Sequence, residues 1–259
     1  MDTFTLQRGH VPLLISLPHD ASAMPASLAA RMQPGARRAP DTDWHVAKLY
    51  EPLAHRLGAS VLKPAASRYV VDLNRPADGH ALYPGRRETG LVSTIGFDGA
   101  PIYLPGHEPD AAEIAERVRI WWQPYHAALA AELARLRAEH GRAVLWDGHS
   151  IRAEVPMLFE GRLPDFNLGT AGGASCRPAL QERLAAVLAG QTRYTQVVNG
   201  RFKGGYITRH YGAPETGIDA VQLELAQCNY MDEASFAWDA AKAASVMALI
   251  GELLAACLE

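Results

Sequence analysis

The sequence predicts an α/β fold in which a mostly parallel sheet is covered by helices on both faces. Short apolar runs alternate along the chain with longer segments rich in Ala, Leu and Arg, as strands and helices alternate in such folds. The chain has 259 residues, of which 48% are hydrophobic and 20% are charged, so it has ample apolar material for a core. This length suits one large α/β domain or two small ones.

Six apolar runs are expected to form buried strands. Strands that are buried on both faces of a parallel sheet consist of nearly continuous apolar residues, without strict alternation of polar and apolar side chains. The runs are residues 11–18, 59–64, 68–73, 143–148, 195–200 and 220–225.

Four longer segments are expected to be helices. They are residues 41–58, 110–141, 177–190 and 233–258. Asp110 and Gly141 are residue types that commonly cap the start and the end of a helix. Pro124 lies inside the second segment and is expected to break or kink it.

Charge, hydropathy and cysteine content exclude several classes of protein. The formal net charge is −3 and no basic run is present, which argues against non-specific binding of nucleic acid. No membrane span is expected, because no apolar stretch approaches about 18 residues. The N-terminus does not resemble a signal peptide, and Cys176, Cys228 and Cys257 form no CxxC pair. These features predict a reduced, cytoplasmic protein.

Two histidines follow apolar runs at positions where ligands are usually bound. In open α/β sheets the ligand lies beyond the carboxyl ends of the strands. His19 follows the run 11–18, and His149 follows the run 143–148. Two imidazoles and one carboxylate can form a metal site with an open position for water, and Asp41 or Asp43 would supply the carboxylate.

Glu224 and a group of arginines complete the candidate site. A glutamate within a strand would face the same side as Gln222, and it could act as a general base towards water on the metal. Arg75 beside Asn74 could bind a carboxylate, because a guanidinium group offers a bidentate fork.

Three further features have weaker assignments. Arg68 could supply a second cation for a carboxylate or for an oxyanion. Arg209 lies among Gly204, Gly205 and Gly212 and is a further candidate for binding an anion. The polar segment 162–176 is expected to be a long loop that forms a lid or part of the pocket wall.

Six segments together resemble the N-formylglutamate amidohydrolase family. The resemblance extends from about residue 12 to residue 235. The segments are 16-SLPHD-20, 40-PDTDWHVAKLY-50, 67-SRYVVDLNRP-76, 147-DGHS-150, 200-GRFKGGYITRHYG-212 and 221-VQLELAQCNYMDE-233.

The resemblance implies one domain over residues 1–259, with a three-layer α/β/α fold and a mixed, mostly parallel, twisted sheet like that of the zinc carboxypeptidases and aspartoacylases. It implies a metal-dependent hydrolysis of N-formyl-L-glutamate, a small anionic N-acyl amino acid, to L-glutamate and formate in histidine degradation. The divalent metal would be Zn²⁺. The implied metal ligands are His19, Asp43 and His149, with Asp41 as the alternative carboxylate; Glu224 would be the general base, Arg68 would polarise the carbonyl, and Asn74 with Arg75 would hold a substrate carboxylate.

Two assignments rest on charge rather than on the resemblance. Arg209 is expected to bind the substrate, and Asp72 is expected to orient an arginine. Two other functions remain open: hydrolysis of a different N-acyl amino acid or peptide on the same fold, and a binding module without catalysis.

Overall fold

The computed structural model describes residues 2–82, 85 and 88–259, which form a single α/β domain around one sheet. The sheet has seven strands in the order β1-β3-β2-β4-β7-β5-β6. Four of the neighbouring pairs are parallel, whereas β1 with β3 and β5 with β7 are antiparallel, which confirms the prediction of a mixed, mostly parallel sheet. The strands are β1 (Phe4–Gln7), β2 (Leu13–Ser16), β3 (Ser60–Pro64), β4 (Ala143–Ile151), β5 (Phe166–Gly169), β6 (Gln196–Val198) and β7 (Ile218–Ala226).

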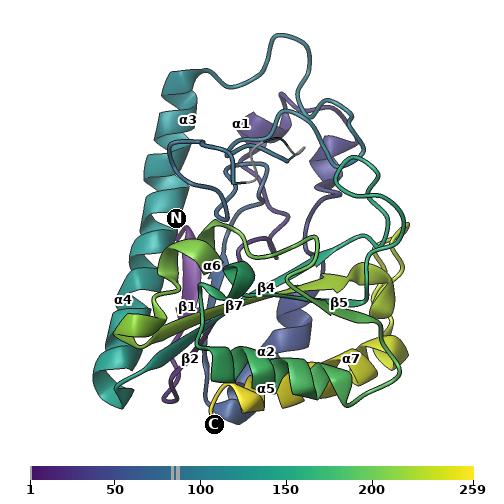
Figure 1. The fold of residues 1–259 in the computed structure, drawn as a ribbon. Coiled ribbons are helices and arrows are strands. Elements are labelled where there is room, and N and C mark those ends of the chain that lie inside the picture. The colour runs from purple at the N-terminus through teal and green to yellow at the C-terminus, as the bar shows by residue number, and fades with distance from the viewer. Residues whose placement is uncertain (1, 83–84, 86–87) are drawn as a thin grey trace.

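Helices cover both faces of the sheet, so the predicted three-layer arrangement is confirmed (Figure 1). One layer consists of α2 (Val46–Leu57), α5 (Pro178–Ala189) and α7 (Ala240–Ala256). The other contains α4 (Gln123–His140) and α6 (Tyr206–Tyr211), and α1 (Ala26–Ala29) and α3 (Ala111–Arg117) lie beyond the sheet. Among the described residues, no helix combines the length and hydropathy needed to cross a membrane.

The central strand β4 shows how the sheet positions its polar residues. All nine of its residues are buried, and alternate apolar side chains enter the two cores on opposite faces. Val144 and Trp146 pack with α2, α5 and α7, whereas Ala143 and Leu145 pack with α4. The carboxyl-terminal half of the same strand carries the polar residues 147–150, so these residues lie at the edge where ligands are expected.

The predicted helix 110–141 is continuous but changes its winding. Asp110 caps α3 by accepting a hydrogen bond from Glu113 N, and Gly141 ends α4 in a left-handed conformation with φ of 74°. Between them lies one turn of π-helix, η2 (Val118–Trp122). Pro124 lies two residues after this turn, and the wider winding accommodates a residue that has no N–H to donate.

The prediction of a strand at 68–73 is wrong, because this segment is a buried turn. Its apolar side chains belong to two different cores: Val70 packs near α1, whereas Val71 packs near α4. Its backbone forms turn bonds rather than a ladder: Val70 N donates to Ser67 O at 2.9 Å, and Arg75 N donates to Asp72 O at 3.2 Å. Its carbonyl groups also accept hydrogen bonds from side chains, such as Arg117 Nη1 to Val70 O at 3.1 Å.

Two other boundaries differ from the prediction. The segment 162–176 is not a long loop, because β5 (Phe166–Gly169) lies within it and pairs with β7. None of its residues lines the cavity described below, so its expected role as a lid or wall is also wrong. The last helix begins at Ala240 rather than near 233, because the Asp239 side chain accepts from the first free N–H groups and caps it there.

His126 of α4 holds the turn that follows Val71. Its Nε2 lies 2.9 Å from Leu73 O, which makes Nε2 the protonated nitrogen, and Nδ1 lies 2.9 Å from the Tyr211 hydroxyl. Trp122 stacks on the imidazole ring, with 3.7 Å between ring centroids, and its own Nε1 donates to Arg75 O at 2.9 Å. Burial lowers the pKa of His126 to about 4.

This pKa shift predicts a dependence of stability on pH. The pKa of His126 is lower in the folded protein than its ordinary value of 6.5. The contribution of neutral His126 to the free energy of unfolding is therefore complete above pH 6.5. The contribution falls as the pH drops through about 4, by about 3 kcal/mol in total. Urea unfolding at several pH values should therefore show a shallower loss of stability in His126→Gln than in the wild type. His140→Gln, on an exposed residue of the same helix, is the control; parallel curves for wild type and His126→Gln would contradict the assignment.

Candidate functional site

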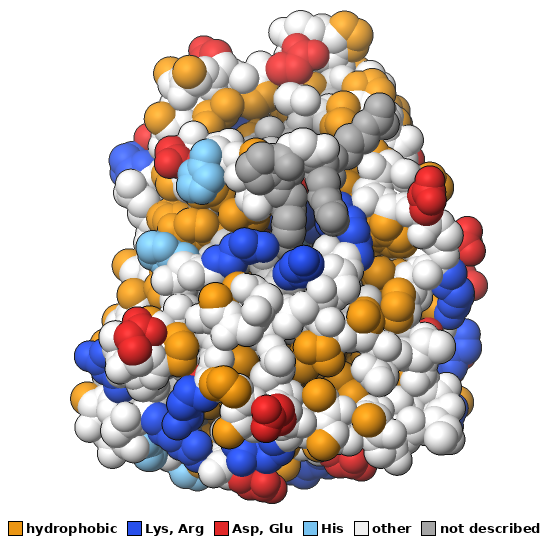
Figure 2. Space-filling view, viewed as in Figure 1, with side chains coloured by type: hydrophobic (Ala, Val, Ile, Leu, Met, Phe, Trp, Pro, Cys, Tyr) orange, Lys and Arg blue, Asp and Glu red, His pale blue; other side chains and the backbone are white. Residues whose placement is uncertain are grey.

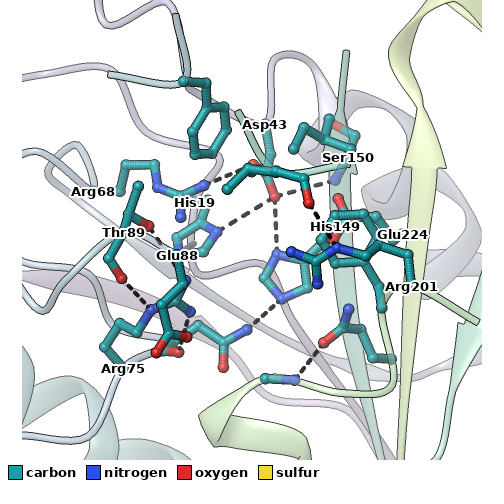
Figure 3. A pocket seen from close by; sticks show the side chains of 17 residues that line it. His19, Asp43, Arg68, Arg75, Glu88, Thr89, His149, Ser150, Arg201 and Glu224 are labelled. Carbon is teal, nitrogen blue, oxygen red and sulfur yellow. Dashed lines mark hydrogen bonds and ion pairs between the residues drawn. The ribbon is translucent and has the colours of Figure 1, made fainter. Parts of the chain in front are cut away.

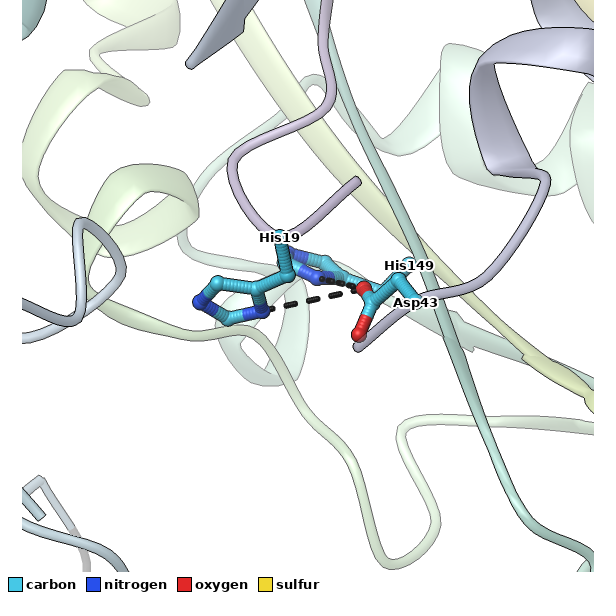
Figure 4. A group of neighbouring side chains, drawn as sticks. All are labelled: His19, Asp43 and His149. Atoms are coloured by element: carbon cyan, nitrogen blue, oxygen red, sulfur yellow. Dashed lines mark hydrogen bonds and ion pairs between the residues drawn. The ribbon is translucent and has the colours of Figure 1, made fainter. Parts of the chain in front are cut away.

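His19, Asp43 and His149 form a buried group that could hold a metal ion (Figure 4). They come from three separate segments: His19 follows β2, Asp43 precedes α2, and His149 lies in β4. One potential ligand atom from each lies within 4.8 Å of the others. The structure therefore brings together the three residues that the sequence resemblance implied, and it places Asp43 rather than Asp41 beside the histidines.

Both imidazole rings direct Nδ1 towards the Asp43 carboxylate. His149 Nδ1 lies 2.9 Å from Asp43 Oδ2, and His19 Nδ1 lies 3.6 Å from the same oxygen. The opposite nitrogens face other carboxylates: His19 Nε2 lies 2.7 Å from Asp72 Oδ1, and His149 Nε2 lies 3.2 Å from Asp147 Oδ2. Histidine ligands of metals commonly have such a carboxylate partner on the outer nitrogen. Two nitrogens and one carboxylate oxygen are a donor set that suits Zn²⁺.

The electrostatics of this group favour a cation. Burial alone would lower the pKa of His149, but the carboxylates of Asp147 and Asp43 outweigh burial and raise it well above its usual value. Burial alone would raise the pKa of Asp43, yet the two histidines hold it below its usual value. Asp43 is thus an ionised buried carboxylate, and positive charge on its neighbours compensates it.

The segment that carries Asp43 is fixed at several points. Asp43 N donates to His19 O at 3.0 Å, and Ser150 N donates to Asp43 Oδ2 at 3.2 Å. The Tyr230 hydroxyl donates to Trp44 O at 2.9 Å, and Gln227 Nε2 donates to Thr42 O at 3.0 Å. The backbone on both sides of Asp43 is therefore held by residues that follow β7.

Asp41 has a different role from the one weighed in the sequence. Its carboxylate accepts hydrogen bonds from the Tyr69 hydroxyl at 2.6 Å and from Phe97 N at 2.8 Å, and Arg152 lies 3.7 Å away. Phe97 lines the cavity, and Arg68 lies 5.0 Å from the centre of its ring. Asp41 therefore supports the cavity wall.

Glu224 lies on β7 directly opposite His149 on β4. Both Glu224 and Gln222 line the cavity, as expected for alternate residues of one strand. Burial raises the pKa of Glu224 to about 8, although His149 acts in the opposite direction. A carboxyl group with a pKa near neutral pH is suited to accept and return a proton.

The segment 67–76 places Arg68 beside Asp43 of the candidate metal group (Figure 3). Arg68 Nη2 donates to Asp72 Oδ2 at 2.7 Å, and the other oxygen of Asp72 faces His19. The expectation that Asp72 orients an arginine is confirmed, and the same carboxylate also orients His19. Arg68 Nη1 lies 3.8 Å from Asp43 Oδ1, so its charge is close to the candidate metal position.

Both ends of the Asn74 amide group contact other residues of the chain. Its Nδ2 lies 2.9 Å from His149 Nε2, and its Oδ1 accepts from Ile207 N at 2.8 Å at the start of α6. A Cβ atom on Gly205 would lie 2.3 Å from Asn74 Nδ2, so only glycine allows α6 to approach this closely. Asn74 thus packs against His149 and fixes the start of α6, and its expected role towards the substrate stays a prediction.

The three arginines expected at the substrate do not all lie at the cavity. Arg68 and Arg75 line it, and Arg75 donates to Thr89 O at 2.7 Å, to Thr89 Oγ1 at 3.3 Å and to Asn74 O at 3.0 Å. Arg209 is exposed on α6, is not among the described residues that line the cavity, and donates through Nε to Gly204 O. The structure does not bring it to the site.

Arg201 lines the cavity instead, although the sequence interpretation did not single it out. Its position after the run 195–200 was a usable signal, because polar residues directly after apolar runs were the criterion for His19 and His149. On the face in Figure 2, Lys and Arg side chains lie near the middle, and others lie towards the lower left.

The comparisons with known proteins agree with this geometry. The sequence matches the model of the N-formylglutamate amidohydrolase family over residues 11–231. It is 54% identical over 258 residues to the N-formylglutamate deformylase of Pseudomonas aeruginosa, covering 99% of this chain and 96% of that protein. It is 51% identical over 229 residues to the N-formylglutamate deformylase of Pseudomonas putida, covering 88% and 85%.

Solved structures share the fold. The N-formylglutamate amidohydrolase of Ralstonia eutropha JMP134 superposes with a TM-score of 0.83 at 25% identity, covering 98% of this chain and 96% of that one. The Atu2144 gene product of Agrobacterium tumefaciens has a TM-score of 0.73 at 18% identity, covering 98% and 92%. The family match, which spans most of the chain, shows that the protein belongs to the N-formylglutamate amidohydrolase family.

Proposed function

We propose that the protein hydrolyses N-formyl-L-glutamate to L-glutamate and formate. The observation that carries the proposal is the buried group His19, Asp43 and His149 beside Glu224, in a chain 54% identical to an N-formylglutamate deformylase. The substrate is inferred from the two Pseudomonas relatives, which are N-formylglutamate deformylases, and the site supplies the chemistry that such a hydrolysis needs. His19, Asp43 and His149 would hold the divalent metal, and their donor set favours Zn²⁺.

When bound, the metal would acidify a water molecule and polarise the formyl carbonyl group. Glu224 would accept the proton that the water loses, and its pKa of about 8 keeps the carboxyl group able to give the proton back. The water oxygen forms a bond to the formyl carbon, and the bond from that carbon to nitrogen breaks. Glu224 returns its proton to the leaving nitrogen, so the products are L-glutamate and formate.

Arg68 would stabilise the negative charge that develops on the formyl oxygen. Its guanidinium group is held by Asp72 at 2.7 Å and lines the cavity beside Asp43 and His149. A donor that is fixed before the reaction does not need to reorganise during it, and losing one such donor in a hydrolase costs about 3–4 kcal/mol of transition-state stabilisation. Arg75 would bind a substrate carboxylate, and the role of Asn74 would be to hold His149 and α6 in place.

Formate release tests the reaction directly. Purified protein should release formate from N-formyl-L-glutamate, a chelator should abolish the release, and added Zn²⁺ should restore it. N-acetyl-L-glutamate and a formyl peptide should be much poorer substrates. Faster hydrolysis of either one would instead support a hydrolase of the same fold with another substrate.

Glu224→Gln tests the general base. The amide cannot accept the proton, so we expect kcat to fall by about 100-fold or more while the metal content stays unchanged. Gln222→Glu is not a suitable control because it adds a charge; Gln222→Met keeps the size of a neighbouring lining residue and should affect kcat less. An unchanged kcat in Glu224→Gln would refute the assignment.

Metal content distinguishes Asp43 from Asp41. After equal treatment with chelator and dialysis against Zn²⁺, Asp43→Asn should bind the metal at least about tenfold more weakly than the wild type, because a charged ligand is lost. Asp41→Asn keeps an acceptor oxygen for Tyr69 and Phe97 and should retain the metal. Metal analysis of both variants, with circular dichroism as a check on folding, makes the comparison; loss of metal only in Asp41→Asn would reverse the assignment.

A further inference from the structure

We propose that Arg201, together with Arg75, makes the site specific for a substrate with two carboxylates. The inference rests on the proposed function, because N-formyl-L-glutamate carries an α-carboxylate and a side-chain carboxylate. Among the described residues, three arginines line the cavity: Arg68, Arg75 and Arg201. The substrate also presents three sites of negative charge, namely two carboxylates and the formyl oxygen during the reaction.

Arg68 is best placed for the formyl oxygen. It is nine-tenths or more buried, paired with Asp72 at 2.7 Å, and lies 3.8 Å from Asp43. Two carboxylates already compensate its charge, so it is poorly suited to bind a third. Its proximity to the candidate metal position places it beside the reacting carbonyl group.

Arg75 can bind one carboxylate but not two. Of its five N–H groups, three donate to the wall of the cavity, at Thr89 O, Thr89 Oγ1 and Asn74 O. The remaining two suit a single bidentate contact. The carboxylates of glutamate are separated by several bonds, so the second one needs another partner.

Arg201 has the position and the fixation that this partner requires. Its Nε donates to Leu158 O at 2.9 Å, and its guanidinium group lies 5.2 Å from the centre of the Phe202 ring. Leu158 and Phe202 line the same cavity, so the arginine is held within the wall. A side chain that is ordered before binding loses less conformational entropy when the substrate arrives.

The positions of Arg75 and Arg201 suit the binding of one carboxylate by each. In the view of Figure 3, Arg75 and Arg201 lie on opposite sides of His149. A glutamate moiety whose formyl group lies at this histidine could direct one carboxylate to each arginine.

Kinetics with amide analogues test the proposal. Arg201→Ala, Arg201→Lys and Arg209→Ala would each be assayed for formate release with N-formyl-L-glutamate, N-formyl-L-glutamine and the α-amide of N-formyl-L-glutamate. For N-formyl-L-glutamate, kcat/KM of Arg201→Ala should fall about 10- to 100-fold, mainly through KM, because a charge-assisted contact is lost. The loss should nearly vanish for one amide analogue, which identifies the carboxylate that Arg201 binds. Arg201→Lys should restore part of the activity, and Arg209→Ala should stay within about twofold of the wild type, because Arg209 does not line the cavity.

Three outcomes would count against the proposals in different ways. An equal loss with all three substrates in Arg201→Ala would mean a structural role only. A loss in Arg209→Ala with an unaffected Arg201→Ala would assign the contact to Arg209. Either result overturns the role of Arg201 while an active wild type leaves the proposed function intact. A wild type that releases no formate from N-formyl-L-glutamate refutes the proposed function itself, and the Arg201 assignment falls with it.

Discussion

The site depends on one costly interaction, the burial of the ionised Asp43 carboxylate between two imidazoles. A buried carboxylate costs several kcal/mol unless charge or hydrogen bonds compensate it. Here Oδ2 receives the Ser150 N–H group and faces Nδ1 of His149 at 2.9 Å and Nδ1 of His19 at 3.6 Å. The surrounding structure keeps these groups in place, because any relaxation would leave a buried charge without a partner. The chain on both sides of Asp43 is tied down for the same reason: Tyr230 holds Trp44 O, and His45 is kept in a left-handed conformation with φ of 64°.

Residues of the segment 67–76 fix the orientation of other side chains in the cavity. Asp72 faces His19 with one oxygen and Arg68 with the other, so a single carboxylate sets the orientation of a candidate ligand and of the residue proposed for the formyl oxygen. Asn74 connects His149 to the first turn of α6. The turn has no strand partner of its own, and His126 and Trp122 supply the missing hydrogen bonds to its carbonyl groups. By packing against this turn, α4 therefore fixes the one short segment that carries Arg68, Asn74 and Arg75 of the cavity wall.

The sequence predicted the sheet and the residues at its strand ends better than it predicted the turns. His19 and His149 could be found because apolar runs fix where a strand ends, and parallel strands end at a common edge. Glu224 could be found because a carboxylate inside a buried strand is costly unless it is paired or has a function. The choice between Asp41 and Asp43 could not be made, because both precede α2 and only the path of the intervening loop decides which one faces the histidines. The run 68–73 has strand-like residues, but its backbone groups bond within turns and to side chains such as Arg117, and this tertiary context overrides the local preference. The assignment of Arg209 to the substrate rests on its charge, which does not distinguish it from Arg201, and the glycines around Arg209 serve ordinary turns equally often.

The placement of charge explains how a protein with a net charge of −3 can suit an anionic substrate. Asp43, Asp72 and Asp147 surround the two histidines, so this end of the cavity attracts a metal cation and would repel a carboxylate. Arg75 and Arg201 line other parts of the same cavity and attract carboxylates. An N-acyl amino acid has its neutral, reactive amide beside its charged carboxylate. This separation of charge in the cavity would therefore favour one orientation of the substrate. The separation of opposite charges within one small cavity can thus orient the amide towards Glu224 before any bond is broken.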